Sequence, residues 1–283
     1  MENELSLTDV AAAARTAGDA RRGGPVSRVF AVARNTFREA VRDRVLYNLV
    51  VFVLLLTGAA IFLGELSASQ ESKIIVDLGL SAVLVFGAFI ATFVGVSLVY
   101  KEIERRTVYA IFAKPVGRGE FLLGKYLGLC LTLALNVAVM GAGVSLALVY
   151  VNGGHNPLAL TVWPALALIY LELTILTAVA LFFSSFSSPA LSALLTFAVF
   201  VVGHFSADLK TFAASLGGGA ARLLFTSLYY LLPNLSTYSY ITPAGHGRAP
   251  AAGYFLAATL YAVAYVAVLI SAAALVFNRR NFK

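Results

Sequence analysis

Long runs of hydrophobic residues alternate with short polar segments along most of this chain. Each run has a length suited to a membrane-spanning helix, which needs roughly 17–25 apolar residues, and none shows the period-two alternation of barrel strands. The six runs cover residues 46–64, 77–99, 121–151, 158–183, 190–206 and 251–277. The pattern therefore predicts an all-α membrane protein with six transmembrane helices.

The composition indicates the same class. The 283 residues are 60% hydrophobic and 12% charged, whereas soluble domains are about 45–50% apolar and about 25% charged. The single cysteine, Cys130, excludes an internal disulfide and a cysteine metal site. His155, His204 and His246 do not have metal-site spacing, and we expect them to be polar loop residues near the external side.

Basic residues predict which ends of the spans face the cytoplasm. Six spans place both termini on one side of the membrane, and that side holds 17 of the 21 lysines and arginines. Cytoplasmic loops carry an excess of these residues. We therefore expect both termini and the charged segment 100–128 to be cytoplasmic.

Three segments outside the spans have patterns of their own. Residues 1–26 are small and polar and predict a disordered cytoplasmic tail, which leaves 27–283 as a single transmembrane domain. Residues 207–250 are apolar but broken by glycines and prolines, which predicts short external helices that re-enter the outer leaflet and are buried against protein. Residues 27–44 predict an interfacial helix, with one apolar face made of Val29, Phe30, Ala33, Phe37, Ala40 and Val41.

The charged segment 100–128 has more order than a polar loop requires. Val108, Ile111 and Phe112 share one face of a short helix, which Pro115 and Gly117 would end. A second helix then leads straight into the next hydrophobic run. A short amphipathic helix joined stiffly to two spans is suited to receive force from a soluble partner.

The same segment contains a partial phosphate-binding pattern, Gly119-Glu-Phe-Leu-Leu-Gly124-Lys125-Tyr126. A P-loop requires Ser or Thr where Tyr126 stands, and a strand before the first glycine. We therefore interpret the two glycines as a helix start and a site of close helix packing.

Glu172 is the one acidic residue in the middle of a predicted span. A charge at that depth costs roughly 2.5–3.5 kcal/mol on insertion scales, so it needs a partner, a proton or water. Two interpretations stay open. Glu172 and Asn136 are candidate pathway residues, or Glu172 makes a structural hydrogen bond to Asn136, a threonine or a neighbouring helix.

The chain from about residue 27 onward resembles the permease subunits of ABC-2-type exporters. Supporting features are the amphipathic helix before the first span, Ser-Ser-Phe-Ser-Ser-Pro at 184–189, Leu232-Pro233-Asn234 and a basic C-terminal tail. The most specific match is to the coupling-helix motif of that family. Its residues here are Glu104, Arg105, Arg106, Thr107, Lys114, Pro115, Arg118, Glu120, Phe121, Gly124 and Lys125. Arg106 departs from the glycine that many members carry.

The resemblance implies a permease of the bacterial cytoplasmic (inner) membrane that is not itself an enzyme. It would pair with a second copy as a homodimer, or with a paralogous permease, and bind two copies of a separate ATPase that holds ATP and Mg²⁺. This chain would hold no cofactor or metal and bind no nucleic acid. The residues expected to contact the ATPase are Glu102, Glu104, Arg105, Arg106, Thr107, Val108, Ile111, Phe112, Lys114, Pro115 and Arg118.

Two other functions are compatible with the sequence. One is a mechanical transmitter, driven by the same ATPase, that acts on an external protein without moving a substrate. It would use residues 207–250 as a docking surface. The other is a proton-coupled secondary transporter that uses Glu172, which should carry more than one ionisable residue inside the membrane.

Overall fold

The computed structural model describes residues 24–42, 71–104, 117–154, 157–215 and 219–279, and the isolated residues 55, 58, 59 and 62. These parts of the chain are helical apart from short connections, and they contain no strand. The all-α prediction is confirmed for them. Most of the expected tail and first span lie outside the described residues, as do Arg105 to Pro115.

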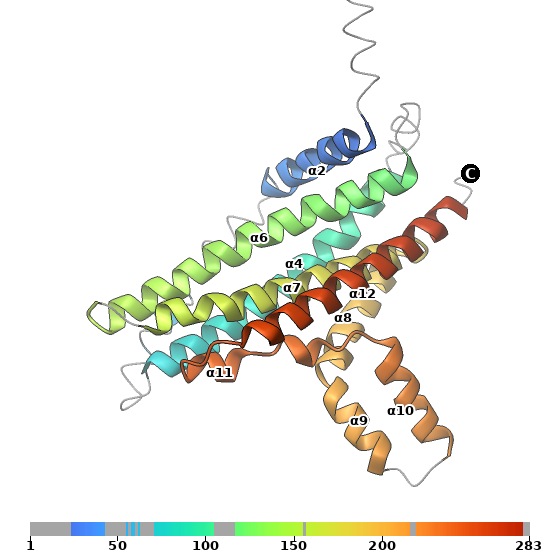
Figure 1. The fold of residues 1–283 in the computed structure, drawn as a ribbon. Helices are drawn as coiled ribbons and strands as arrows, with labels where there is room; N and C mark the ends of the chain where they lie inside the picture. The colour runs from blue at the N-terminus through green and yellow to red at the C-terminus, as the bar shows by residue number, and fades with distance from the viewer. Residues whose placement is uncertain are drawn as a thin grey trace, which may run out of the picture.

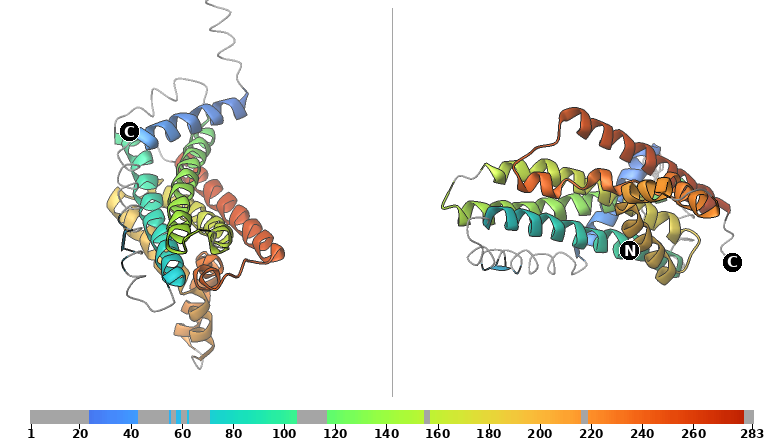
Figure 2. Two further views of the ribbon diagram at one scale, coloured as in Figure 1. Left: turned by 90° about the vertical axis from the view of Figure 1, so that its left-hand side faces the viewer. Right: turned by 90° about the horizontal axis from the view of Figure 1, so that it is seen from below.

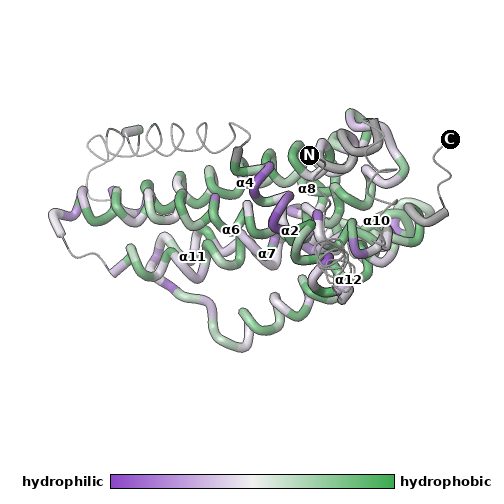
Figure 3. Tube along the Cα trace, turned by 90° about the horizontal axis from the view of Figure 1, so that it is seen from above, coloured by the Kyte–Doolittle hydropathy of each residue, from purple (hydrophilic) through white to green (hydrophobic). Residues whose placement is uncertain are grey.

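Four long helices form the body of the protein (Figure 1). They are α4 (Glu71–Glu104), α6 (Arg118–Val151), α7 (Leu158–Ser184) and α12 (Ala252–Arg279). Each contains a segment of at least 25 residues that is apolar enough to cross a membrane. Hydrophilic residues are concentrated on α2 and towards the ends of the long helices (Figure 3). The predicted spans at 77–99, 121–151, 158–183 and 251–277 are therefore confirmed as helices of spanning length.

The connection from α6 to α7 shows why the chain reverses there. The Asn152 side chain donates a hydrogen bond to the Leu148 carbonyl at 2.8 Å and closes the last turn of α6. Gly153 and Gly154 then take positive φ angles of 66° and 146°, which a residue with a side chain rarely adopts. The turn that ends α6 is thereby explained by its own residues at 152–154.

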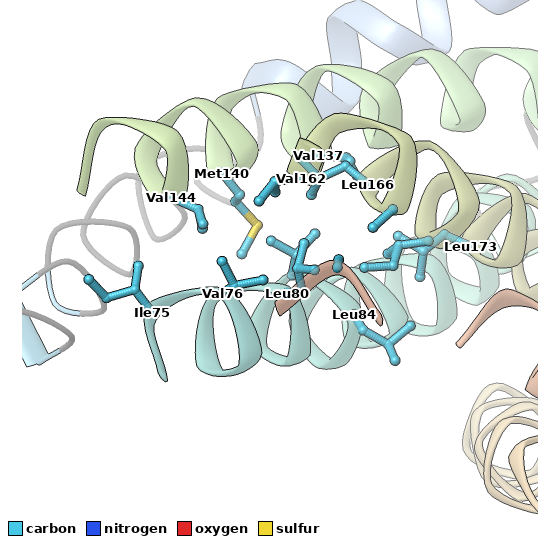
Figure 4. Close-up of a cluster of buried hydrophobic side chains, with 14 of the residues drawn as sticks. Ile75, Val76, Leu80, Leu84, Val137, Met140, Val144, Val162, Leu166 and Leu173 are labelled. Atoms are coloured by element: carbon cyan, nitrogen blue, oxygen red, sulfur yellow. The ribbon is translucent and has the colours of Figure 1, made fainter. Parts of the chain in front are cut away.

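Helix α7 is the centre of the bundle. In its most hydrophobic segment 72% of the residues are buried, against 17% for α12, which lies at the edge. A core of aliphatic side chains from α4, α6 and α7 fills the space between them (Figure 4). Gly87 lets α4 approach closely, because a Cβ atom there would lie 2.4 Å from a Leu173 methyl carbon. Gly87 therefore serves close helix packing within the subunit.

The fifth expected span, 190–206, is represented by the shorter helix α8 (Pro189–His204). Sixteen residues rise about 24 Å, which is less than the roughly 30 Å of a hydrocarbon core. Pro189 occupies the first turn, where its missing N–H costs nothing. The chain bends at Phe205 into α9. Since most of the first expected span lies outside the described residues, the count of six remains a prediction.

Residues 207–250 form the short helices that the sequence predicts. They are α9 (Ser206–Ser215), α10 (Ala220–Leu231), the 3₁₀ helix η1 (Leu235–Tyr238) and α11 (Ile241–Gly245). Leu235, Tyr238 and Ala244 are fully buried against the bundle. In contrast, α9 and α10 form a hairpin that projects sideways from the long helices (Figures 1 and 2), and α10 has no buried residue. The expectation of burial against protein therefore holds for η1 and α11 but not for α10 within this chain.

Helix α2 (Pro25–Arg42) lies across the beginning of α6, where the 27–44 helix is predicted. Its contact face includes Val29, Val32, Ala33 and Thr36. Phe30, which the pattern places on the apolar face, is 69% exposed. The reason is that α6 presents glycines at the crossing, and these accept small side chains and backbone rather than an aromatic ring.

Candidate functional site

Two helices frame the predicted coupling segment. Glu102 and Glu104 belong to the last turn of α4, and Arg118 is the first residue of α6. The intervening residues that the sequence assigns to the ATPase contact lie outside the described part of the chain. Each of the two helices has 34 residues and a length of about 51 Å, well beyond the roughly 30 Å of a hydrocarbon core. The coupling segment is therefore joined at each end to a helix that is long enough to cross a membrane.

The start of α6 is fixed by Glu120. The backbone N–H of Gly117 donates to Glu120 Oε2 at 3.1 Å, which satisfies a donor at the helix N-terminus. A carboxylate in the first turn also interacts favourably with the positive end of the helix dipole. Glu120 Oε1 lies 3.4 Å from Arg28 Nη2 of α2. One side chain thus fixes where α6 begins and connects it to α2.

A second ion pair lies one turn further along α6. Lys125 Nζ is 3.6 Å from Glu39 Oε2, and its side chain is only 2% exposed. The same ammonium group lies 5.7 Å from the ring centroid of Phe121, within cation–π range. Because a buried ammonium group is costly without compensation, these contacts explain how Lys125 is accommodated beneath α2.

Gly124 and Gly128 are positions of α6 at which α2 packs closely. A Cβ atom at 124 would lie 2.6 Å from Val32 Cβ, and one at 128 would lie 2.6 Å from the Ala33 carbonyl oxygen. The second contact is with backbone, which cannot rotate out of the way. The P-loop-like pattern is therefore a packing motif here, as predicted for its glycines, and its lysine forms an ion pair with α2.

Glu172 has a partner that the sequence did not reveal. Its side chain is completely buried, and its Oε1 atom lies 3.2 Å from Nε2 of His204 at the end of α8. This is an ion-pair distance, although the two groups are not aligned for a hydrogen bond. His204 is therefore not a loop residue, and of the partners considered for Glu172 the structure supports a neighbouring helix.

The two ring nitrogens of His204 have different surroundings. His204 Nδ1 lies 3.0 Å from the Phe200 carbonyl oxygen, so Nδ1 carries a proton, because a carbonyl only accepts. Nε2 faces Glu172 but has no hydrogen-bond partner among the described residues, and the same holds for both oxygens of the Glu172 carboxyl group. The two side chains are therefore close, at 3.2 Å, without a hydrogen bond between them.

Asn136 is separate from this pair. Its side chain is 1% exposed, and its amide nitrogen and oxygen have no hydrogen-bond partner among the described residues. The structure does not bring Asn136 and Glu172 together by a hydrogen bond. Tyr238 of η1 packs in a buried cluster that includes Val199 of α8, and burial raises the pKa of its hydroxyl. That hydroxyl stays protonated and donates to the Ala258 carbonyl at 2.8 Å.

Comparison with known proteins identifies the family. A family model described as ABC-2 family transporter protein matches residues 30–282. The chain belongs to this family. It is 30% identical over 125 residues to the "Probable ABC transporter permease protein NosY" of Pseudomonas aeruginosa, an alignment that covers 42% of this chain and 45% of that protein. The protein of the same name from Stutzerimonas stutzeri is 28% identical over 119 residues, covering 40% and 43%. The chain thus matches less than half the length of these relatives.

Membership of the ABC-2 family bears on the two features described above, the junction of α2 with α6 and the Glu172–His204 pair. The family consists of membrane-embedded transporter components, in agreement with the hydrophobic bundle. The junction of α2 with α6 borders the coupling segment predicted for the family, whereas the Glu172–His204 pair lies within the bundle. Sequence reasoning missed Arg28, Glu39 and His204. For Arg28 and Glu39 the spacing in the sequence was a clue, because residues 11 apart on a helix lie on the same face. For His204 there was no such clue.

Proposed function

We propose that this ABC-2 family member is the transmembrane permease subunit of an ABC transporter, exporting a substrate when a separate ATPase subunit hydrolyses ATP. The supporting observation is the family match over residues 30–282. The similarity to two proteins named as probable ABC transporter permeases agrees with it. Two permeases and two ATPases would form the complete transporter, with the basic ends of the helices in the cytoplasm.

The ATPase would bind the segment between α4 and α6. In this proposal Val108, Ile111 and Phe112 fill an apolar groove of the ATPase, while Glu104, Arg105 and Arg106 set the register at the rim. Closure of the ATPase dimer would move the segment, and the long helices α4 and α6 would carry that movement across the membrane.

Purification in mild detergent tests this function. The wild-type permease should retain its ATPase subunit, together with ATP turnover. Phe112→Ala should weaken retention roughly 30-fold, since a buried anchor contributes about 2 kcal/mol or more. Arg106→Ala should give a milder, salt-dependent defect, because rim charges mainly affect association rate. An ATPase that binds equally well to the Phe112 variant would show that this segment is not the docking element.

One observation keeps the proton-coupled transporter as a second candidate. That function needs more than one ionisable group in the membrane, and His204 beside Glu172 supplies the second. A proton gradient that drives flux in the absence of any ATPase would favour it. The mechanical transmitter retains the exposed helix α10 as a docking surface, and binding of an external protein that depends on α10 would favour that function.

A further inference from the structure

A groove lies on the outside of the bundle between the first halves of α7 and α12. It has a volume of about 680 Å³ and is lined by residues of both helices and of the connection that precedes α12. Ligand sites commonly enclose about 300–1,000 Å³. Space for the groove arises because the beginning of α12 stands away from the other long helices (Figure 2). Residues 252–254 are exposed, whereas Ala258 and Ala262 further along are buried.

The lining of the groove is mostly hydrocarbon. Ala167 and Leu256 contribute aliphatic surface from the two helices, and Phe255 contributes an aromatic ring. Pro164 adds ring carbons and has no backbone N–H. The Thr259 hydroxyl donates to the Phe255 carbonyl of its own helix at 2.8 Å, so its hydrogen is already used. A groove of this kind in a membrane-spanning region accommodates a hydrocarbon chain.

Trp163 supplies a polar group at one end of this lining. Its side chain is 40% exposed, and its indole N–H has no hydrogen-bond partner among the described residues. Residue 163 follows the start of α7 at Leu158 by five residues, which rise about 7.5 Å. Tryptophan is typical of the boundary between hydrocarbon and headgroups, because its ring is apolar and its N–H is a donor. The indole can therefore donate to a polar group that lies just above a hydrocarbon chain.

A cation lies at the end of the groove where both helices begin. Arg248 precedes Pro250, a lining residue, by two positions, and its exposed side chain has no ion-pair partner among the described residues. Its backbone N–H donates to the Pro243 carbonyl at 3.0 Å, which fixes the chain there. Gly247 has a φ of 70°, and a Cβ atom at 247 would lie 3.3 Å from a Leu158 methyl carbon. The backbone beside Arg248 thus contacts the first residue of α7.

We propose that this groove binds a membrane phospholipid, with an acyl chain between α7 and α12 and the phosphate at Arg248. The order of the three features matches a phospholipid read from headgroup to chain. A cation lies at the mouth, the Trp163 N–H lies below it to donate to an ester oxygen, and apolar walls follow. An arginine can bind phosphate through two parallel hydrogen bonds. This inference does not rest on ATP-driven export, because the ligand comes from the leaflet at this end of the bundle.

Intrinsic fluorescence can test the proposal, since Trp163 is the only tryptophan in the chain. The full-length protein, freed of lipid in a non-ionic detergent, is titrated with phosphatidylglycerol that carries bromine on its acyl chains. Bromine quenches a tryptophan that it contacts. We expect quenching that saturates at a low mole fraction of lipid in the micelle, as a single site requires. Brominated diacylglycerol has the same chains without the phosphate and should bind about tenfold more weakly, because it lacks the charge-assisted hydrogen bonds to Arg248.

Two variants remove different parts of the site. Arg248→Gln should weaken binding of phosphatidylglycerol about tenfold and leave binding of diacylglycerol unchanged. Ala167→Phe should abolish the saturable quenching, since its ring would occupy the groove. Arg222→Gln on α10 and Ala257→Phe on α12 are the matched controls, because both positions are exposed and neither lines the groove. Both controls should bind phosphatidylglycerol as the parent does.

Two results would overturn the proposal. Equal binding of the two lipids, or of phosphatidylglycerol to Arg248→Gln and the parent, would remove the role of the phosphate. Quenching that rises linearly with lipid content, and is the same in Ala167→Phe, would show random encounters with lipid in the micelle. None of these outcomes depends on an ATPase, so this inference and the proposed function can fail independently.

Discussion

At the middle of α7, the fully buried Glu172 carboxyl group lies 3.2 Å from Nε2 of His204, whose side chain is 23% exposed. At this distance each polar group lowers the cost of burying the other. Replacing one partner exposes the other to the full desolvation penalty, whereas replacing both with apolar residues removes the penalty altogether. This asymmetry separates a structural role from a functional one.

We expect Glu172→Leu to destabilise the protein by about 1–3 kcal/mol, because it leaves His204 Nε2 buried without a partner. The double variant Glu172→Leu, His204→Leu should regain most of that loss. Glu172→Gln should be nearly as stable as the parent, since it keeps the shape of the side chain and leaves a polar group 3.2 Å from Nε2. Thermal unfolding of the purified protein in one detergent measures all three.

Transport activity of the Gln variant completes the test. If Glu172 is structural, Glu172→Gln remains active because a polar side chain of the same shape stays beside His204. An inactive but fully stable Gln variant would contradict the structural role and favour the pathway interpretation. A Leu variant as stable and active as the parent would reject both.

The sequence revealed one half of this pair. A carboxylate within a hydrophobic run is conspicuous by its cost, so Glu172 could be singled out. His204 could not, because its depth depends on where α8 ends. A helix of full spanning length would have placed residue 204 at the external side, whereas the bend at Phe205 leaves it level with Glu172.

At the scale of elements, the crossing of α2 and α6 shows how glycine position sets helix placement. Gly128→Val should displace α2, since a branched side chain cannot fit against the Ala33 carbonyl and Thr36. We expect faster amide hydrogen exchange throughout α2, while α7 exchanges as in the parent. Gly119→Val is the matched control, because a Cβ atom at 119 has nothing within 4 Å. Equal exchange in α2 for the two variants would contradict this account.

The amphipathic pattern predicted α2 to within two residues at each end, and yet it assigned Phe30 to the wrong side. Hydrophobic periodicity identifies a helix with an apolar face, but it does not reveal what that face meets. Here the partner surface contains two glycines, so Val32 and Thr36 fit and a phenyl ring does not. Phe30 is left exposed at 69%, where a lipid environment would cover it.

The segment 207–250 shows the same limit. Glycines and prolines in 207–250 predicted several short helices, and four short helical elements are present. The local sequence did not indicate that η1 packs against the bundle while α9 and α10 project from it. That difference depends on tertiary contacts. One example is the Asn234 side chain, which accepts hydrogen bonds from Ser206 and Ser236, both at 2.6 Å.

At the scale of the whole molecule, the order of the helices agrees with the alternation that the hydrophobic runs predict. The start of α4 meets the end of α6 through a hydrogen bond between Ser72 and Asn152. At the opposite end, Ile270 of α12 belongs to one buried cluster with Leu122, near the start of α6, and Leu181, near the end of α7. The helix ends thus sort into two groups, and the basic residues predict that the second group faces the cytoplasm.

Cysteine labelling tests this orientation at positions that the structure shows to be exposed. In a Cys130→Ala background, Gly117→Cys and Ser188→Cys lie at the end assigned to the cytoplasm, and Ala249→Cys lies at the other. A membrane-impermeant maleimide should label position 249 in intact cells and should label positions 117 and 188 only after the membrane is opened. The physical reason is the asymmetry of 17 basic residues against four, which resists translocation of the basic ends. Labelling of 117 or 188 from outside intact cells would reverse the orientation. It would also place the coupling segment beyond the reach of a cytoplasmic ATPase, so the proposed function depends on this result.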